Sequence, residues 1–140
     1  MSASPPDPAF AITPVAKILL IDDDEFIRKL LRTVLRQLGH AVIEATNGHE
    51  GLKLCADADL MILDLFMPEM DGLEFLLELR RQQASVKVII ISGNVVALED
   101  LPDAKQPGST KMLQKPFTIG ALTAAVNGLL GVDPLGSDSR

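Results

Sequence analysis

Five short strand-like runs recur along the chain, and each is followed by a stretch long enough to form a helix. They cover residues 17–21, 41–43, 60–63, 86–91 and 111–114. The first run, Lys-Ile-Leu-Leu-Ile, is apolar at positions that would face both sides of a sheet. Strands with two apolar faces are typical of a parallel sheet that helices cover on both sides. The runs therefore predict five strands of such a sheet.

The stretches between these runs carry apolar residues at helical spacing. After the first run, apolar residues follow one another at intervals of 3, 1, 3, 1 and 3, which places them on one face of a helix. These residues are Ile27, Leu30, Leu31, Val34, Leu35 and Leu38. Gly39 is well placed to end this helix. Further helices are predicted after Asn47-Gly48, after Gly72, at residues 94–104 and from Thr118 to Leu130.

Alternation of strands and helices indicates an α/β domain with a mostly parallel sheet and helices on both faces. Its strand–helix–strand connections are expected to be right-handed. Pro102 and Pro107 make the fourth helix, at 94–104, short or irregular. We assign residues 16–131 to the domain, residues 1–15 to a flexible leader and residues 132–140 to a flexible tail.

The composition narrows the classes of function. The formal net charge of the 140 residues is −6, so the basic surface that direct nucleic-acid binding needs is not expected. No apolar run reaches the ~20 residues of a membrane span, and the first residues do not form a signal peptide. The single cysteine, Cys55, is expected to be a buried structural thiol. We therefore expect a soluble, cytoplasmic protein.

Polar residues follow directly on the predicted strands. Asp22 and Asp23 follow the first strand, Asp64 the third, Ser92 the fourth and Lys115 the fifth. The functional crevice of an open parallel sheet lies outside the carboxyl ends of its strands, so these side chains are expected to meet there. Clustered carboxylates repel one another unless a cation lies between them, and hard oxygen ligands suit Mg²⁺. The pattern predicts a magnesium site.

Asp64 is the candidate reactive group. A carboxylate can attack phosphorus to form an acyl phosphate, and a bound metal would offset its repulsion of the incoming phosphate. Ser92 and Lys115 could then donate to the phosphoryl oxygens. Plainer interpretations are also open at this point. The acids at 22–25 could be the first turn of a helix, and Asp64 could be a turn residue ahead of Pro68.

Four segments of the chain together resemble the receiver domains of two-component response regulators. They are Ile21-Asp22-Asp23-Asp24, the LDLFMPEMDG segment at 63–72, Ile91-Ser92-Gly93 and Lys115-Pro116-Phe117. The match covers about residues 16–131. The resemblance implies the flavodoxin-like (βα)5 fold with strand order 2-1-3-4-5. Because only about ten residues follow the last predicted helix, the chain looks like a stand-alone, chemotaxis-regulator-like receiver.

The resemblance also implies roles at the acidic site. Asp64 matches the phosphoacceptor, Asp23 a direct ligand of Mg²⁺, and Asp22 the acid that holds the ion through water. The backbone carbonyl of Phe66 matches the remaining protein ligand. The implied donor is a phosphohistidine on a sensor histidine kinase or a histidine phosphotransfer domain. The domain would catalyse this transfer in a phosphorelay without turning over an external substrate as an enzyme does.

The resemblance further implies a switch. Ser92 matches its hydroxyl, and Lys115, joined to Pro116 by a cis peptide bond, matches the lysine that pairs with the phosphoryl group. Met112 stands where the family has an aromatic residue, and the fourth helix is short, so the surface they form is expected to signal differently. Phosphorylation is expected to change binding to an unidentified downstream protein, with the chain a monomer or weak homodimer.

Two other functions are compatible with parts of the sequence. The Asp22-x-Asp24 pattern after an apolar strand is similar to that of haloacid-dehalogenase-type phosphatases, in which the first Asp is the nucleophile and the second an acid/base. That interpretation leaves Asp64 and its loop unexplained. The other function is that of a receiver that is never phosphorylated and acts only by docking. The complete acidic set argues against it.

Overall fold

Strands and helices alternate along the described part of the chain. The computed structural model describes residues 15–67, 70–82, 86–93 and 110–131, with the backbone alone for 66–67 and 70–73. The elements are β1 (Lys17–Ile21), α1 (Glu25–Gln37), β2 (Ala41–Ala45), α2 (Gly48–Leu54), a 3-10 turn (Cys55–Asp57), β3 (Leu60–Asp64), β4 (Phe66–Met67), β5 (Met70–Asp71), α3 (Gly72–Arg81), β6 (Lys87–Ser92), β7 (Thr110–Gln114) and α4 (Ile119–Leu130). The expected leader up to residue 14, the helix at 94–104 and the tail from 132 lie outside the described residues.

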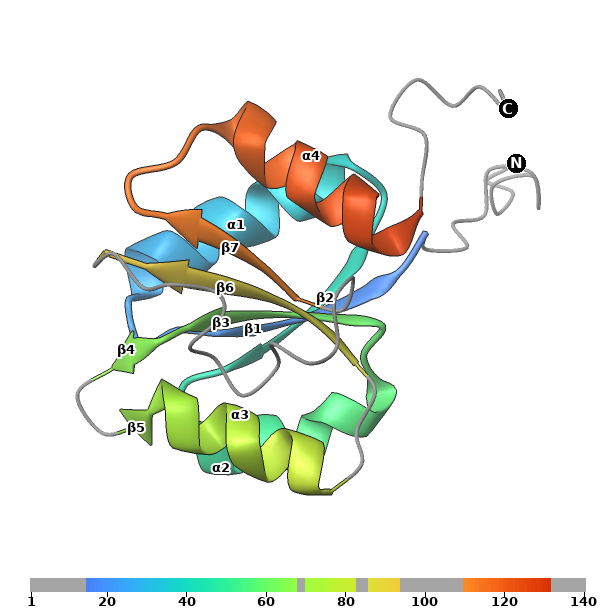
Figure 1. The fold of residues 1–140 in the computed structure, drawn as a ribbon. Helices are drawn as coiled ribbons and strands as arrows, with labels where there is room; N and C mark the ends of the chain where they lie inside the picture. The colour runs from blue at the N-terminus through green and yellow to red at the C-terminus, as the bar shows by residue number, and fades with distance from the viewer. Residues whose placement is uncertain (1–14, 68–69, 83–85, 94–109, 132–140) are drawn as a thin grey trace.

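Five of the strands form one parallel sheet, in the order β2-β1-β3-β6-β7. Counted along the sheet's own strands, this is the predicted order 2-1-3-4-5. Helices α1 and α4 cover one face of the sheet, and α2 and α3 cover the other (Figure 1). Because all five strands run the same way, their carboxyl ends meet at one edge, at the left in Figure 1.

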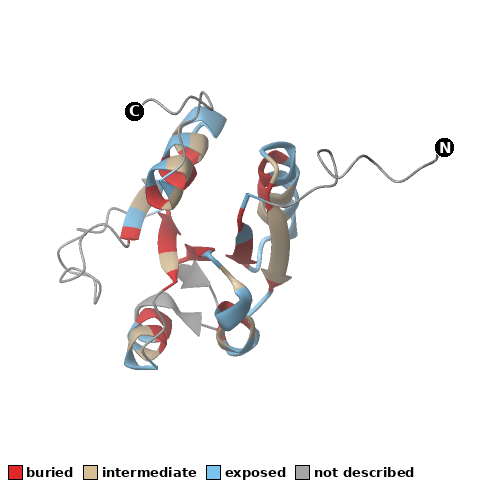
Figure 2. Ribbon diagram, turned by 90° about the vertical axis from the view of Figure 1, so that its right-hand side faces the viewer, coloured by how far each residue is buried: buried red, intermediate tan, exposed pale blue. Residues whose placement is uncertain are grey.

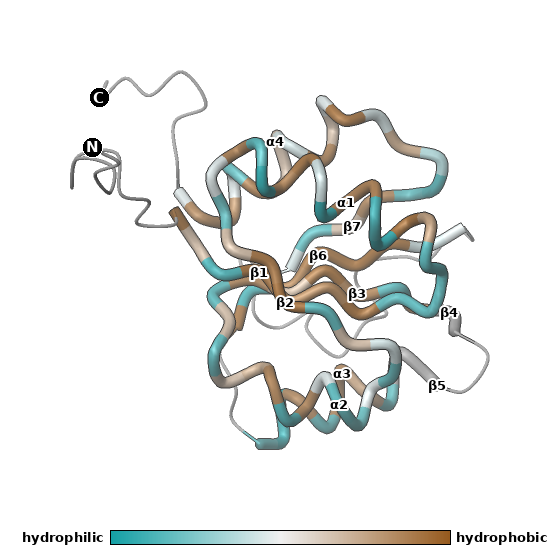
Figure 3. Tube along the Cα trace, turned by 180° about the vertical axis from the view of Figure 1, so that it is seen from behind, coloured by the Kyte–Doolittle hydropathy of each residue, from teal (hydrophilic) through white to brown (hydrophobic). Residues whose placement is uncertain are grey.

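Alternate residues of each central strand pack on opposite faces of the sheet. In β1, Ile18 and Leu20 belong to the core cluster under α1 and α4, whereas Leu19 and Ile21 belong to the cluster under α2 and α3. Burial is concentrated on the strands and on the helix sides that face them (Figure 2). The hydropathy colouring likewise places the apolar residues at the centre, between the helical layers (Figure 3). Two covered faces explain why the central strands β1, β3 and β6 are apolar along most of their length.

Helix α1 ends where the sequence predicts. Gly39 has a φ of +95°, which is the left-handed region that glycine adopts without strain. Its N–H donates to the carbonyl of Arg36 at 3.0 Å, and the N–H of His40 donates to that of Leu35 at 3.1 Å. These two bonds make up a Schellman motif, which satisfies carbonyls that the helix end would leave open.

The structure differs from the sequence-based elements in a few places. A short antiparallel hairpin of β4 and β5 pairs Phe66 with Asp71. Two-residue strands are too short to show any periodicity, so no pattern in the sequence predicts them. Strand β3 extends by one residue to Asp64, β6 ends at Ser92, and β7 begins at Thr110. The polar residues at these ends belong to the strands themselves.

Two further expectations concern Cys55 and the helices. Cys55 is buried, and its thiol donates to the carbonyl of Leu52 at 3.2 Å. Burial raises the pKa of this thiol, which keeps it protonated and confirms the expected buried thiol. Within the residues that the structure describes, every helix is too short or too polar to cross a bilayer.

Substituting Gly39 tests the end of α1. Gly39→Ala is expected to lower the free energy of unfolding by about 1 kcal/mol, because a left-handed conformation costs an L residue roughly 1–2 kcal/mol. Gly120→Ala in α4 is the matched control, since a Cβ there would meet only Thr118 Oγ1 at 3.8 Å. The control should be neutral or slightly stabilising. Urea unfolding followed by circular dichroism measures both, and equal losses would contradict the role of Gly39.

Candidate functional site

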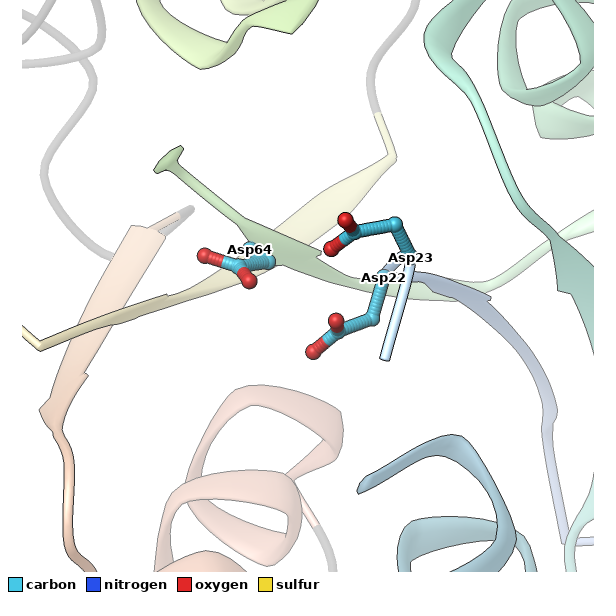
Figure 4. Close-up of side chains that lie close together, drawn as sticks. All are labelled: Asp22, Asp23 and Asp64. Atoms are coloured by element: carbon cyan, nitrogen blue, oxygen red, sulfur yellow. The ribbon is translucent and has the colours of Figure 1, made fainter. Parts of the chain in front are cut away.

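Three carboxylates meet at the carboxyl edge of the sheet. Strands β1 and β3 are neighbours, with Ile21 opposite Leu63, so the residues that follow them, Asp22 and Asp64, lie side by side. One oxygen from each of Asp22, Asp23 and Asp64 lies within 4.8 Å of the other two. Figure 4 shows these side chains extending from the ends of the two strands on the same side. The predicted acidic cluster is therefore present.

Asp22 is the most constrained of the three acids. It is 2% exposed, and its Oδ1 accepts the N–H of Asp24 at 2.8 Å. Its Oδ2 is buried and accepts no hydrogen bond from the described residues. Burial raises the pKa of Asp22 to about 6; the charges of Asp64 and Asp23 act in the same direction, and the Asp24 N–H and Lys115 oppose them. A buried carboxylate oxygen that lacks a donor and faces two other acids fits a hard divalent cation.

Lys115 reaches into this cluster from the end of β7. Its Nζ lies 3.3 Å from Asp64 Oδ2 and 3.9 Å from Asp22 Oδ2, with the side chain 28% exposed. One ammonium against three carboxylates leaves two negative charges when all are ionised, and one divalent metal ion would neutralise them. The peptide bond between Lys115 and Pro116 is cis, as expected.

Ser92 is the last residue of β6 and is fully buried. Strand β6 lies between β3 and β7, with Ile91 opposite Asp64, so Ser92 also lies at the carboxyl edge. Its carbonyl accepts the backbone N–H of Lys115 at 2.7 Å. The structure thus joins the predicted hydroxyl and the predicted lysine through their main chains.

The remaining predicted positions are less fully described. Phe66 lies in β4, just beyond Asp64. The role of its backbone carbonyl as a metal ligand stays a prediction. Met112 is half-buried on β7 and packs against the core cluster on the α2 and α3 side.

Asp24 has a separate task from the cluster. Its Oδ1 accepts the N–H groups of Phe26 at 2.9 Å and Ile27 at 3.2 Å, which makes it the N-cap of α1. This confirms the interpretation of this acid as a helix start. The phosphatase interpretation needs Asp24 as an acid/base beside Asp22, so the cap does not favour it.

Sequence reasoning missed one contact with the site. The Arg28 Nη1 donates to the backbone carbonyl of Asp22 at 2.7 Å, and its Nε donates to Glu44 Oε1 at 3.2 Å. Glu44 also pairs with Arg32. Burial would raise the pKa of Glu44, but the two guanidiniums outweigh it and lower that pKa. The sequence offers no signal for this contact, since an arginine on the polar side of an amphipathic helix is commonplace.

Comparisons of the sequence and of the structure with known proteins all point to response regulators. Residues 18–127 match the family model described as the response regulator receiver domain. The chain is 35% identical over 127 residues to the transcriptional regulatory protein GlrR of Escherichia coli K12, a match that covers 89% of this chain and 28% of GlrR. The chain spans about half, or less, of the length of the first curated relatives that it matches.

The chain also matches solved structures of similar fold, and two of these matches cover nearly the whole of the solved chain. The receiver domain of the Francisella response regulator 1452 superposes with a TM-score of 0.71 at 33% identity, over 83% of this chain and 97% of that one. The response regulator TrrA of Thermotoga maritima, solved in complex with Mg(2+)-BeF, gives a TM-score of 0.69 at 32% identity, over 81% and 97%.

The raised pKa of Asp22 predicts how stability depends on pH in metal-free buffer. Because this pKa lies above its ordinary value of 3.8, the ionised carboxylate disfavours the folded state above about pH 6. Asp22→Asn should therefore raise the free energy of unfolding near neutral pH, by about 1–3 kcal/mol. The gain should shrink as the pH falls below 6 and should disappear well below 3.8, where wild-type Asp22 is protonated in both states.

Urea unfolding with EDTA across this pH range measures the difference. Asp57→Asn removes the same charge from an exposed position at the opposite end of β3 and is the matched control. A gain for Asp22→Asn that did not vary with pH, or that the control reproduced, would contradict the assigned cause.

Proposed function

The chain belongs to the response regulator receiver domains of two-component systems, and we propose that its Asp64 accepts a phosphoryl group from a phosphohistidine. The observation that carries the proposal is the setting of Asp64 at the end of β3. Its carboxylate lies beside those of Asp22 and Asp23 and 3.3 Å from the ammonium of Lys115. A carboxylate that is buried in this way, with a cation in reach, is an oxygen nucleophile prepared for an anionic substrate.

The transfer step follows from this arrangement. A carboxylate oxygen of Asp64 attacks the phosphorus atom, an O–P bond forms and the P–N bond to the donor imidazole breaks. The electron pair returns to the imidazole nitrogen, which takes up a proton from solvent. Asp22, Asp23, Asp64 and the Phe66 carbonyl would hold Mg²⁺, which supplies positive charge to the phosphoryl oxygens and to the acids.

Lys115 and Ser92 respond to the new group. The ammonium of Lys115, which lies 3.3 Å from Asp64 Oδ2, donates to a phosphoryl oxygen once Asp64 is phosphorylated. The hydroxyl of Ser92 donates to another. The backbone bond from Lys115 to the Ser92 carbonyl couples the two residues, so movement of one shifts the end of the neighbouring strand. This is the local event that a partner would detect.

The remaining parts of the proposal concern the domain's surroundings. We infer a unit at residues 16–131 that works in the cytoplasm, receives its phosphoryl group from a sensor histidine kinase or a histidine phosphotransfer domain, and binds a downstream protein in response. It turns over no external substrate. The docking-only function shares the fold and the site, and it differs only in whether Asp64 is modified, so labelling decides between them.

Phosphorylation of Asp64 is tested by mass. Incubation with a small-molecule phosphodonor and Mg²⁺ should add ~80 Da, the mass of one acyl phosphate on a carboxylate nucleophile. Asp64→Asn should take up nothing, while Asp57→Asn, an exposed acid outside the site, should be labelled as the wild type is. EDTA should prevent labelling. An unmodified wild-type protein would favour the docking-only function, and labelling that persisted in EDTA would contradict the metal site.

Lys115 is expected to compete with the metal for the carboxylates. Removing an ammonium 3.3 Å and 3.9 Å from two of them lowers the positive potential at the site. Lys115→Ala should therefore bind Mg²⁺ about three- to tenfold more tightly by calorimetry. Its labelling should nevertheless be slower, because a hydrogen-bond donor to the phosphoryl oxygens is lost. Lys111→Ala, which removes an exposed lysine that lies against Gly128, is the control. Weaker Mg²⁺ binding by Lys115→Ala would refute the competition.

A further inference from the structure

Arg28 touches the turn that carries two of the carboxylates. Its guanidinium lies largely buried, with the side chain 14% exposed, and Nη1 donates to the Asp22 carbonyl at 2.7 Å. The backbone N–H of Arg28 donates to the carbonyl of Asp24 at 3.0 Å. One residue of α1 therefore holds the turn between β1 and α1 at both of its ends.

The contact with the Asp22 carbonyl fixes more than one residue. That carbonyl belongs to the planar peptide unit that joins Asp22 to Asp23, so holding its oxygen orients the backbone on both sides. The Asp22 N–H makes a longer contact of 3.4 Å with the Ala45 carbonyl, and the Asp24 N–H donates to the Asp22 carboxylate at 2.8 Å. The bond from Arg28, at 2.7 Å, holds the peptide unit between the two acids, whereas the Asp24 N–H holds the Asp22 carboxylate itself.

Glu44 on β2 holds the guanidinium in place. Arg28 Nε donates to Glu44 Oε1 at 3.2 Å, and Arg32, one turn further along α1, pairs with Oε2 of the same carboxylate. The pairing orients the planar fork of Arg28 so that its other edge faces the turn. The charge of Glu44 also offsets that of Arg28, so a cation near Asp22 meets little repulsion from this arginine.

We propose that Arg28 is a positioning residue for the acidic site: clamped by Glu44, it holds the Asp22–Asp23 peptide so that both carboxylates face the metal position. The inference rests on the proposed function, because the metal is the one proposed there. Arg28 touches neither the metal position nor the phosphoryl group, and it acts only through the turn. Residues that orient metal ligands in this way commonly affect metal affinity by 10-fold or more.

The chain offers a matched control for this idea. Arg32 shares the partner Glu44 and the helix face with Arg28, and among the described residues its side chain pairs with Glu44 alone. Arg28→Ala and Arg32→Ala each remove one ion pair from α1 and put the same residue in its place. Only the first removes the bond to the Asp22 carbonyl. Arg28→Ala should therefore lose more stability than Arg32→Ala, and it alone should change the site.

The test is Mg²⁺ affinity by calorimetry, together with amide hydrogen exchange at Asp24 in metal-free protein. Arg28→Ala should bind Mg²⁺ about tenfold more weakly, and its Asp24 amide, which donates to Asp22 Oδ1, should exchange faster. Arg32→Ala should keep the wild-type value of both. Wild-type affinity in Arg28→Ala, or an equal loss in Arg32→Ala, would overturn the inference.

Arg28→Lys separates geometry from charge and serves if Arg28→Ala does not fold. A single ammonium cannot donate to Glu44 and to the Asp22 carbonyl in the planar arrangement of a guanidinium, so this variant should also bind Mg²⁺ more weakly. Wild-type Mg²⁺ affinity in Arg28→Lys would show that the positive charge alone suffices, and it would contradict the role of the planar guanidinium. Failure of the proposed function is distinguishable, because the wild-type protein itself would then neither bind Mg²⁺ nor accept a phosphoryl group.

Discussion

The site depends on one constraint, which is the mutual repulsion of the carboxylates of Asp22, Asp23 and Asp64 at the carboxyl end of a buried sheet. Asp22 and Asp64 are almost fully buried, and parallel pairing of β1 and β3 holds them side by side. Neither can move into solvent without breaking the strand ends. The molecule therefore needs positive charge at this edge, and Lys115 supplies only one unit of it. A divalent ion and a phosphoryl group are the kind of ligand pair that such a site can hold together.

Each neighbouring element contributes one feature to this edge. Strand β3 ends on Asp64, the proposed nucleophile, β6 ends on Ser92, and β7 leads into Lys115. The main-chain bond from Lys115 to the Ser92 carbonyl joins the ends of β6 and β7. Helix α1 helps to hold the turn that carries Asp22 and Asp23. Asp24 in this turn caps the helix, and Arg28 of the helix donates to the Asp22 carbonyl. The site is thus a property of the sheet edge as a whole.

The succession of strands along the chain and the acidic cluster could be predicted because both depend on local patterns, whereas the order of the strands within the sheet was implied by the resemblance to receiver domains. Apolar runs give the strands, Gly39 gives the end of α1, and residues directly after strands must lie at the same edge of a parallel sheet. The hairpin of β4 and β5 could not be predicted, since two residues carry no period. The contact of Arg28 with the Asp22 carbonyl could not be predicted either, because side-chain bonds to main-chain atoms depend on tertiary geometry that no spacing encodes. The roles of Ser92 and of the Phe66 carbonyl remain predictions from resemblance.

The division of the core into two clusters has a consequence for how such a domain can diversify. The sheet separates the side chains under α1 and α4 from those under α2 and α3, so each layer can be repacked with little effect on the other. The chemistry sits where the two layers meet, on strand ends that belong to both. Lineages can therefore remodel one helical surface for a new partner while the opposite layer preserves the backbone under the reactive groups.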